Sequence, residues 1–227
     1  MYIEDERRKR YMNAVQNRIR EGKSVLIYGR FGCGKSEFIR QIETPQRCKR
    51  IEIESLASVH VILGTILETM GIADFSIKPP SAMHKSRYLQ AIKGIDKKYL
   101  LIIDEANDLK KQTWPYLKRI MDAGVSIILS GKPKIIQFLE NNHKDILSRL
   151  KLLPLVPVGP EDFKAALPDF DPLAVEIIYG EVNNDIRKMT EELIPDCRNY
   201  ITANNYEKVT PEVANMFCDA LFEDRNI

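Results

Sequence analysis

One run of eight residues constrains the fold of this chain more than any other feature: Gly29-Arg30-Phe31-Gly32-Cys33-Gly34-Lys35-Ser36. It has the form G-x-x-x-x-G-K-[ST], in which glycines let backbone N–H groups turn inward around an anion that side chains would keep away. An apolar run typical of a buried strand, residues 24–28, precedes it, and residues 35–42 have helical spacing. This context predicts a phosphate-binding loop in a parallel α/β sheet and disfavours a glycine-rich turn that holds no nucleotide.

The chemistry of such a loop assigns roles to its residues. Lys35 is expected to reach the β- and γ-phosphates of a nucleotide, and Ser36 is expected to hold Mg²⁺. Cys33 is interpreted as a spectator whose oxidation would obstruct the site. The predicted nucleotide-binding residues are the loop and the residue after it, namely Gly29, Arg30, Phe31, Gly32, Cys33, Gly34, Lys35, Ser36 and Glu37.

An acidic pair follows the most apolar of the predicted strands. Residues 99–103 form that strand, and Asp104 and Glu105 come directly after it. Ligands of open parallel sheets bind beyond the carboxyl ends of the strands, so Asp104 is expected to hold the water shell of Mg²⁺ and Glu105 to polarise an attacking water. The pair alone could also be an acidic helix start. Together with the phosphate loop it favours nucleotide hydrolysis and disfavours a small-molecule kinase.

The remaining pattern indicates an α/β domain followed by helices. Further strands are predicted at residues 50–53, 125–129 and 150–156, and helices at 3–20, 56–70, 85–95, 110–123 and 133–139, with a connection at 72–84. Alternating strands and helices are typical of a three-layer α/β core, here with a five-stranded parallel sheet. Beyond Pro160 the periodicity is only helical. We therefore predict an α/β domain at residues 1–158 and a small all-helical lid domain at 159–227.

Charge is divided unevenly between these two parts. Residues 1–159 contain 28 Lys and Arg against 17 Asp and Glu, a net charge of +11, whereas residues 160–227 contain 6 against 15, a net charge of −9. A basic body suggests a polyanionic partner. Acidic and basic lobes also pack on one another in oligomers, so both interpretations stay open at this point.

Composition excludes several classes of protein. Hydrophobic residues make up 44% of the chain, enough for a sizeable core, but no apolar run reaches the ~20 residues of a membrane span. The N-terminal residues lack the apolar stretch of a secretory signal, and the four cysteines show no metal-binding or disulfide spacing. We expect a cytoplasmic protein with reduced thiols and no membrane partner.

The phosphate loop, the run Ile102-Ile103-Asp104-Glu105-Ala106 and the helical tail together resemble an AAA+ ATPase, from about residue 10 to residue 220. The resemblance implies a P-loop NTPase fold, with ATP and Mg²⁺ as ligands. It also implies three further site residues. Ser130 matches the sensor-one position, where Asn or Thr is commoner, Arg149 matches the arginine finger, and Arg187 matches the sensor-two arginine of the lid.

Within this superfamily the chain most resembles the ExeA/TniB/TnsC/MuB-type regulators of transposition. The similarity lies in Asp104-Glu105-Ala106, residues 128–133, residues 147–150 and Pro154-Leu155. It implies binding of DNA in the ATP state, assembly as a ring or helical filament, and recruitment of a transposase. Clamp-loader and replication-initiator ATPases share several of these signatures, so the partner could instead be a replication protein. A further alternative is a signalling NTPase that acts on proteins and does not bind DNA.

Two expectations about assembly follow from the resemblance. Arg149 is expected to complete the nucleotide site of the next subunit, in a head-to-tail homo-oligomer. Because no helix-turn-helix or zinc module is visible, DNA binding is expected to use the basic body and to tolerate any sequence. The candidate DNA contacts are its Lys and Arg clusters, namely Arg7 to Arg10, Lys78, Lys85, Arg87, Lys97, Lys98, Lys110, Lys111, Lys118, Arg119, Lys132 and Lys134.

Overall fold

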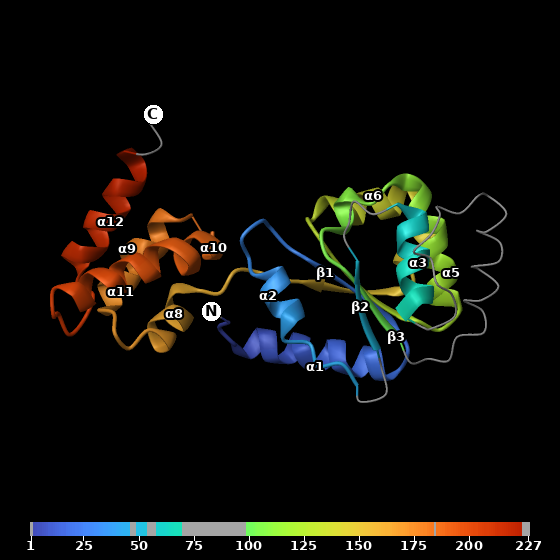
Figure 1. Cartoon of the computed structure of the whole chain (residues 1–227), viewed down its shortest axis with the longest axis horizontal. Helices are drawn as coiled ribbons and strands as arrows, with labels where there is room; N and C mark the ends of the chain where they lie inside the picture. The colour runs from blue at the N-terminus through green and yellow to red at the C-terminus, as the bar shows by residue number, and fades with distance from the viewer. Residues whose placement is uncertain (1, 46–48, 54–57, 70–98, 184, 224–227) are drawn as a thin grey trace. The chain divides into compact units, whose positions relative to one another are not determined.

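A five-stranded parallel sheet forms the centre of the α/β part of the chain (Figure 1). The computed structural model describes residues 2–45, 49–53, 58–69, 99–183 and 185–223. The strands are β1 Ser24–Tyr28, β2 Lys49–Ile53, β3 Tyr99–Ile103, β4 Ser126–Gly131 and β5 Leu150–Pro154, in the spatial order β2-β3-β4-β1-β5. The predicted sheet is therefore confirmed, and it places the carboxyl ends of β3, β4 and β1 side by side.

Helices cover both faces of the sheet. They are α1 Glu6–Arg20, α2 Lys35–Arg40, α3 Val59–Thr69, α5 Trp114–Asp122, α6 Lys134–Asn142 and α7 Lys144–Leu147, with short 3₁₀ turns η1 Ala106–Asp108 and η2 Lys111–Thr113. Alternate strand residues such as Leu101 and Ile103 pack in one core cluster with residues of α3, α5 and α6, including Trp114 and Leu117. Figure 1 shows α1 on the opposite side of the sheet from α6.

Local chemistry explains where the helix bounds differ from the sequence prediction. The first helix begins at Glu6 instead of residue 3, because the Asp5 carboxylate accepts the Arg8 backbone N–H at 2.6 Å and so caps the helix. Residues 111–113 form a 3₁₀ turn before α5, and Pro115 lies in the first turn of α5, where its missing N–H costs nothing. The helix predicted at 85–95 and the connection at 72–84 lie outside the described residues.

The C-terminal part of the chain is helical, as predicted. Its helices are α8 Pro160–Ala166, α9 Pro172–Glu181, α10 Ile186–Lys188, α11 Ile194–Ala203 and α12 Pro211–Glu223, with a π-helical turn, η3 Met189–Leu193, between α10 and α11. Pro195 accounts for the π-helical turn, because a proline in a helix removes one backbone donor and displaces the preceding turn. Buried side chains of α8 to α12, such as Phe163, Ile178 and Cys197, form their own core cluster.

The chain divides into two compact units. One contains Met1–Lys9, Arg30–Phe38 and Leu155–Ile227, and the other contains Arg10–Gly29 and Ile39–Pro154. The phosphate loop thus belongs to the same unit as the C-terminal helices and the first residues of the chain. The acidic strand end belongs to the unit of the sheet. The domain boundary at residues 158–159 stays a prediction.

No helix within the described ranges is long and apolar enough to cross a bilayer.

Candidate functional site

Asp104 and Ser130 meet at the carboxyl ends of two neighbouring strands. Asp104 follows β3, Ser130 is the second-to-last residue of β4, and the two strands are paired in register from Leu100 to Ile103. The fully buried Ser130 hydroxyl donates a hydrogen bond to Asp104 Oδ1. The hydroxyl therefore fixes the direction of a carboxylate that is itself only partly buried.

Glu105 has an unusual backbone conformation. Its φ of 52° and ψ of 43° lie in the left-handed region, which non-glycine residues rarely adopt. Its N–H donates to Asp104 Oδ1 at 2.9 Å, and its side chain is exposed. The chain thus turns directly after β3, with the Glu105 N–H bonded to the Asp104 carboxylate. Strain of this kind persists where the surrounding structure holds it, and it is frequent in active sites.

Asn107 holds that strained turn against β4, a role that the sequence did not indicate. The Asn107 side-chain oxygen accepts the Lys132 backbone N–H at 2.5 Å. It lies so close to Gly131 that a Cβ there would be 2.6 Å from it. The segment after β3 is therefore linked twice to the end of β4, by the Asp104–Ser130 hydrogen bond within the strand and by the Asn107–Lys132 hydrogen bond just beyond it. An asparagine shortly after an acidic pair is common in sequences and does not stand out. The role of Asn107 could have been predicted only by knowing that the segment after β3 lies against Lys132, 25 residues further along the chain.

The phosphate loop begins where β1 ends, next to the same part of β4. The Gly29 N–H donates to the Gly131 carbonyl at 3.1 Å. Beyond it, Gly32 and Gly34 have φ angles of +73° and +83°, as a loop with inward-facing amides needs. Lys35 Nζ donates to the carbonyl of Arg30 at 2.8 Å across the loop. The glycine geometry and the lysine both fit the nucleotide that the motif predicts.

Cys33 is completely buried within the loop. Burial raises the pKa of its thiol, against the opposing effect of the nearby Lys35 and Arg8 cations. Because a thiolate and not a thiol is the reactive form, this residue is a poor nucleophile at neutral pH. Its burial agrees with the interpretation of Cys33 as a spectator.

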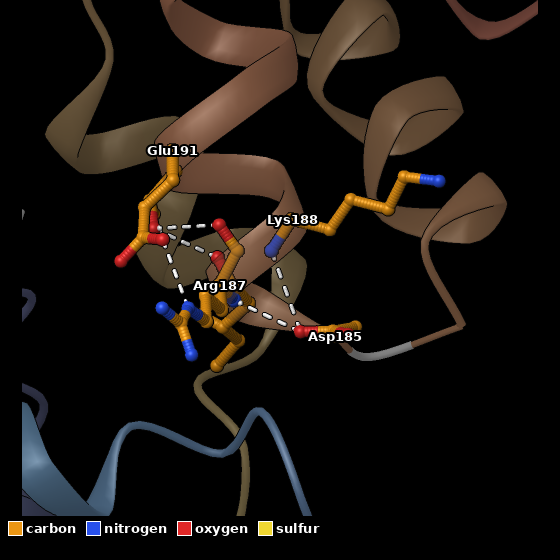
Figure 2. Close-up of polar contacts among 6 residues, drawn as sticks. Asp185, Arg187, Lys188 and Glu191 are labelled. Carbon is orange, nitrogen blue, oxygen red and sulfur yellow. Dashed lines mark hydrogen bonds and ion pairs between the residues drawn. The ribbon is translucent and has the colours of Figure 1, made fainter. Parts of the chain in front are cut away.

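The predicted sensor-two segment begins with a capping carboxylate (Figure 2). Asp185 Oδ1 accepts the backbone N–H groups of Arg187 and Lys188 at 3.2 and 3.3 Å. A Cβ at Gly32 would lie 2.5 Å from the same oxygen, so Asp185 lies directly against the phosphate loop within their common unit. Arg187 Nε is 2.8 Å from Glu191 Oε2, an exposed pair one turn apart.

Arg149, the predicted arginine finger, follows α7 on the surface of the sheet unit. Its Nε is 2.9 Å from Asp122 Oδ1, and its guanidinium also donates to the carbonyl of Asp145. The side chains of Arg149 and Asp122 are 37% and 45% exposed. Ion pairs this exposed contribute about 0–1 kcal/mol, so the guanidinium can exchange this partner at little cost.

The structure corrects one of the predicted DNA contacts. Arg8 is only 3% exposed, so its inclusion among the surface contacts was wrong. Lys118 forms an ion pair with Asp145 at 2.6 Å. The candidates Lys78, Lys85, Arg87, Lys97 and Lys98 lie outside the described residues. The exposed candidates in the described part are Arg7, Lys9, Arg10, Lys110, Lys111, Arg119, Lys132 and Lys134.

The structure therefore gathers the predicted residues in two groups. Ser130 and Asp104 are hydrogen-bonded at the carboxyl ends of β4 and β3, with Glu105 next in the chain, whereas Lys35 and Ser36 lie in the phosphate loop, in the other unit. The strand order β3-β4-β1 and the loop that follows β1 define a P-loop nucleotide-binding protein.

A protein-family model described as an AAA domain matches residues 18–139, more than half of the chain, and the chain belongs to this family. The matched segment contains the phosphate loop, the acidic strand end and Ser130. Members of this P-loop NTPase family generally hydrolyse ATP. A comparison with curated protein sequences gives no significant match.

Several solved structures have the same fold at low sequence identity. The Aeropyrum pernix Orc1 protein in complex with DNA has a TM-score of 0.70 at 17% identity, with 98% of this chain and 66% of that chain covered. Pyrobaculum aerophilum Cdc6p has a TM-score of 0.72 at 14% identity, with 93% and 67% covered. The Thermotoga maritima RuvB Holliday junction branch migration motor has a TM-score of 0.65 at 14% identity, with 96% of this chain and 70% of that chain covered. This chain thus spans just under two thirds of the Orc1 chain, and these likenesses establish the fold.

Proposed function

We propose that this chain is a Mg²⁺-dependent ATPase whose assembled form binds DNA. The observation that carries the proposal is the group at the carboxyl ends of β3 and β4, where the Ser130 hydroxyl donates to Asp104 and Glu105 follows in a strained left-handed conformation. This group adjoins the end of β1, from which the phosphate loop begins. Each of these features supports a site for water attack on a phosphate.

Separate residues would perform the separate tasks of hydrolysis. Lys35 and the loop amides would bind the β- and γ-phosphates, while Ser36 and Asp104 would hold Mg²⁺, which neutralises phosphate charge when bound. Glu105 would accept a proton from the attacking water, and Ser130 would keep Asp104 in place. Arg187 would approach the phosphates from the C-terminal helices, after leaving its exposed pair with Glu191.

Arg149 supports an oligomeric enzyme. A guanidinium donated by a neighbouring subunit stabilises the charge that develops on the transferred phosphoryl group and can raise the rate by about 10³–10⁵-fold. The exposed Asp122 pair would hold Arg149 until that neighbour arrives. The contact is heterologous, so copies would close into a ring or continue as a helical filament.

Mixing two inactive variants tests this arrangement. We expect Arg149→Ala alone and Lys35→Ala alone to be at least about 100-fold slower in ATP hydrolysis than the unmodified protein. A mixture should recover part of the rate, because an Arg149-bearing Lys35→Ala subunit completes the intact phosphate loop of an Arg149→Ala neighbour. Phosphate release over a range of mixing ratios measures this recovery. If no ratio recovers activity although both variants co-assemble, the shared site is refuted.

DNA binding is supported by the exposed cations and by the fold. Asn107 joins two segments that carry such cations, with Lys110 and Lys111 after η1 and with Lys132 and Lys134 after β4. One similar structure, Orc1, was solved in complex with DNA. Lysine contacts to phosphates give affinity without sequence preference. In the alternative, the basic residues form only contacts between subunits, and the protein has no affinity for DNA.

A salt series separates these alternatives. If four lysines contact phosphates, the affinity for duplex DNA in the presence of a nonhydrolysable ATP analogue should fall roughly 100-fold between 50 and 200 mM salt. Lys134→Gln should make the slope of log affinity against log salt shallower by about 1. Lys151→Gln, which removes an exposed lysine of β5, should leave the slope unchanged. Fluorescence anisotropy provides the measurement, and undetectable binding at 50 mM would favour a signalling NTPase that acts on proteins.

Two biological roles fit an ATP-dependent DNA-binding oligomer. Recruitment of a transposase to target DNA is supported by the sequence resemblance around Asp104 and Ser130. A replication initiator is supported equally by the likeness to Orc1 and Cdc6p. Footprinting on random and origin-like duplexes, together with electron microscopy of the ATP-analogue complex, distinguishes them. A sequence-tolerant filament favours target selection, and a bounded footprint at one sequence favours an initiator.

A further inference from the structure

A buried arginine from the first helix lies against the phosphate loop. Arg8 is in the first turn of α1, and its Nη2 donates to the Cys33 carbonyl at 2.8 Å. A Cβ at Gly34 would lie 3.3 Å from Arg8 Nη1 and 3.4 Å from Nη2, so the guanidinium packs closely against this part of the loop. Arg8, Cys33 and Gly34 all belong to one compact unit. The contact spans 25 residues of sequence, and the motif itself gives no sign of it.

The charge of this arginine is only partly compensated. The Asp5 carboxylate is 3.9 Å from Arg8 Nε and already caps the helix through its other oxygen. Nε has no hydrogen-bond partner among the described residues. The ring of Tyr2 lies 5.9 Å from the guanidinium carbon. Burial lowers the pKa of Arg8, against the effect of Asp5 and smaller ones of Tyr2, Cys33 and Asp162, although an arginine stays protonated in proteins.

Such an arrangement is costly unless an anion completes it. A buried cation with an incomplete set of partners loses hydration that one carboxylate at 3.9 Å does not replace. If Arg8 only held the Cys33 carbonyl in place, a neutral hydrogen-bond donor would be enough and the positive charge would not be needed. A phosphate group in the adjacent loop would supply the missing negative charge. The position of the arginine, on the loop that the motif assigns to phosphates, indicates which anion that is.

We propose that Arg8 is a nucleotide-positioning residue, which holds the phosphate loop through the Cys33 carbonyl and gives that loop a second positive charge beside Lys35. The inference rests on the proposed nucleotide binding and extends it to the first helix. It makes the start of α1 part of the site for a nucleoside di- or triphosphate. It also explains why one member of a basic cluster, Arg7 to Arg10, is buried while its neighbours are exposed.

Substitutions at Arg8 with a matched control test the proposal by calorimetric titration with ADP and ATP. Arg8→Gln removes the charge and should raise both dissociation constants about 10- to 100-fold, the range of a hydrogen bond to a charged group. Arg8→Lys keeps the charge but loses the planar fork, so its dissociation constants should lie between those of the unmodified protein and Arg8→Gln. Arg20→Gln makes the same charge change at an exposed position of the same helix and should leave both constants unchanged.

The outcomes separate this inference from the proposed function. If the unmodified protein binds neither nucleotide, the proposed function fails. If it binds them and Arg8→Gln binds as tightly as Arg20→Gln, only the role of Arg8 is overturned. If Arg8→Lys binds as weakly as Arg8→Gln, the charge is irrelevant and Arg8 merely shapes the loop, which also overturns the proposal.

A second measurement needs no variant and covers the case in which Arg8→Gln does not fold. Binding sites that are coupled stabilise one another reciprocally. Saturating ADP should therefore slow amide hydrogen exchange in the first turns of α1, as well as in the phosphate loop. Protection of the loop with unchanged exchange in α1 would refute the coupling through Arg8.

Discussion

Glu105→Gln is expected to slow ATP turnover at least about 100-fold while ATP affinity stays within about twofold of the unmodified protein. The amide keeps the size and the exposed position of the side chain but cannot accept a proton from water, and general-base catalysis contributes about 10²–10⁴-fold. Single-turnover hydrolysis and equilibrium titration measure the two effects separately. The variant should accumulate in the ATP-bound, assembled state.

A nearby acidic residue provides the control for this variant. Asp108→Asn makes the same chemical change three residues later, at an exposed position in η1. It should leave turnover within about twofold, because only Glu105 occupies the strained position directly after Asp104. Normal turnover by Glu105→Gln would mean that another group activates the water. Equal losses in both variants would point to damage of the η1 segment instead.

Lys35→Ala is expected to weaken ATP and ADP binding at least about 100-fold and to abolish hydrolysis. The substitution removes the cation that should pair with the β- and γ-phosphates, and charge-assisted contacts of this kind are among the strongest that proteins make. It also removes the 2.8 Å hydrogen bond from Nζ to the Arg30 carbonyl, which spans the loop. Titration with a fluorescent ADP analogue measures the loss.

Lys23→Ala serves as the control for the lysine. Lys23 is exposed beside β1 and forms a surface pair with Glu21, so its loss should leave nucleotide affinity unchanged. Thermal unfolding of both variants shows whether the loop collapses without Lys35. A Lys35→Ala protein that is folded and still binds ADP with the affinity of Lys23→Ala would remove the basis of the phosphate-loop assignment.

Much of the fold was predictable because short-range patterns determine it. Buried parallel strands are continuous apolar runs, as in residues 99–103, and the glycine-rich loop between β1 and α2 has a fixed form. The start of the first helix was predicted three residues too early, because apolar periodicity at Ile3 does not reveal that the Asp5 side chain caps the helix. Helix ends depend on such single hydrogen bonds, and periodicity does not report them.

The candidate site was predictable only in part, for a related reason. Asp104 and Lys35 are identified by motifs with fixed spacing. The residues that hold these motifs in place come from distant segments of the chain. Asn107 acquires its role from the backbone of Lys132, and Arg8 from the carbonyl of Cys33. Arg8 lies in a basic run that is typical of a solvated surface. Its burial follows from tertiary packing, which outweighs the general tendency of charged residues to stay exposed.

Gly131 offers a way to alter the catalytic rate without changing any group that would touch the nucleotide. Since even one methyl group there would lie 2.6 Å from the Asn107 side-chain oxygen, an alanine would push that side chain away from the Lys132 N–H that it now accepts. A displacement of a few tenths of an ångström changes the alignment of a base with its water far more than it changes ground-state binding. We therefore expect Gly131→Ala to loosen the link between the segment after β3 and Lys132, and to slow hydrolysis more than it weakens nucleotide binding.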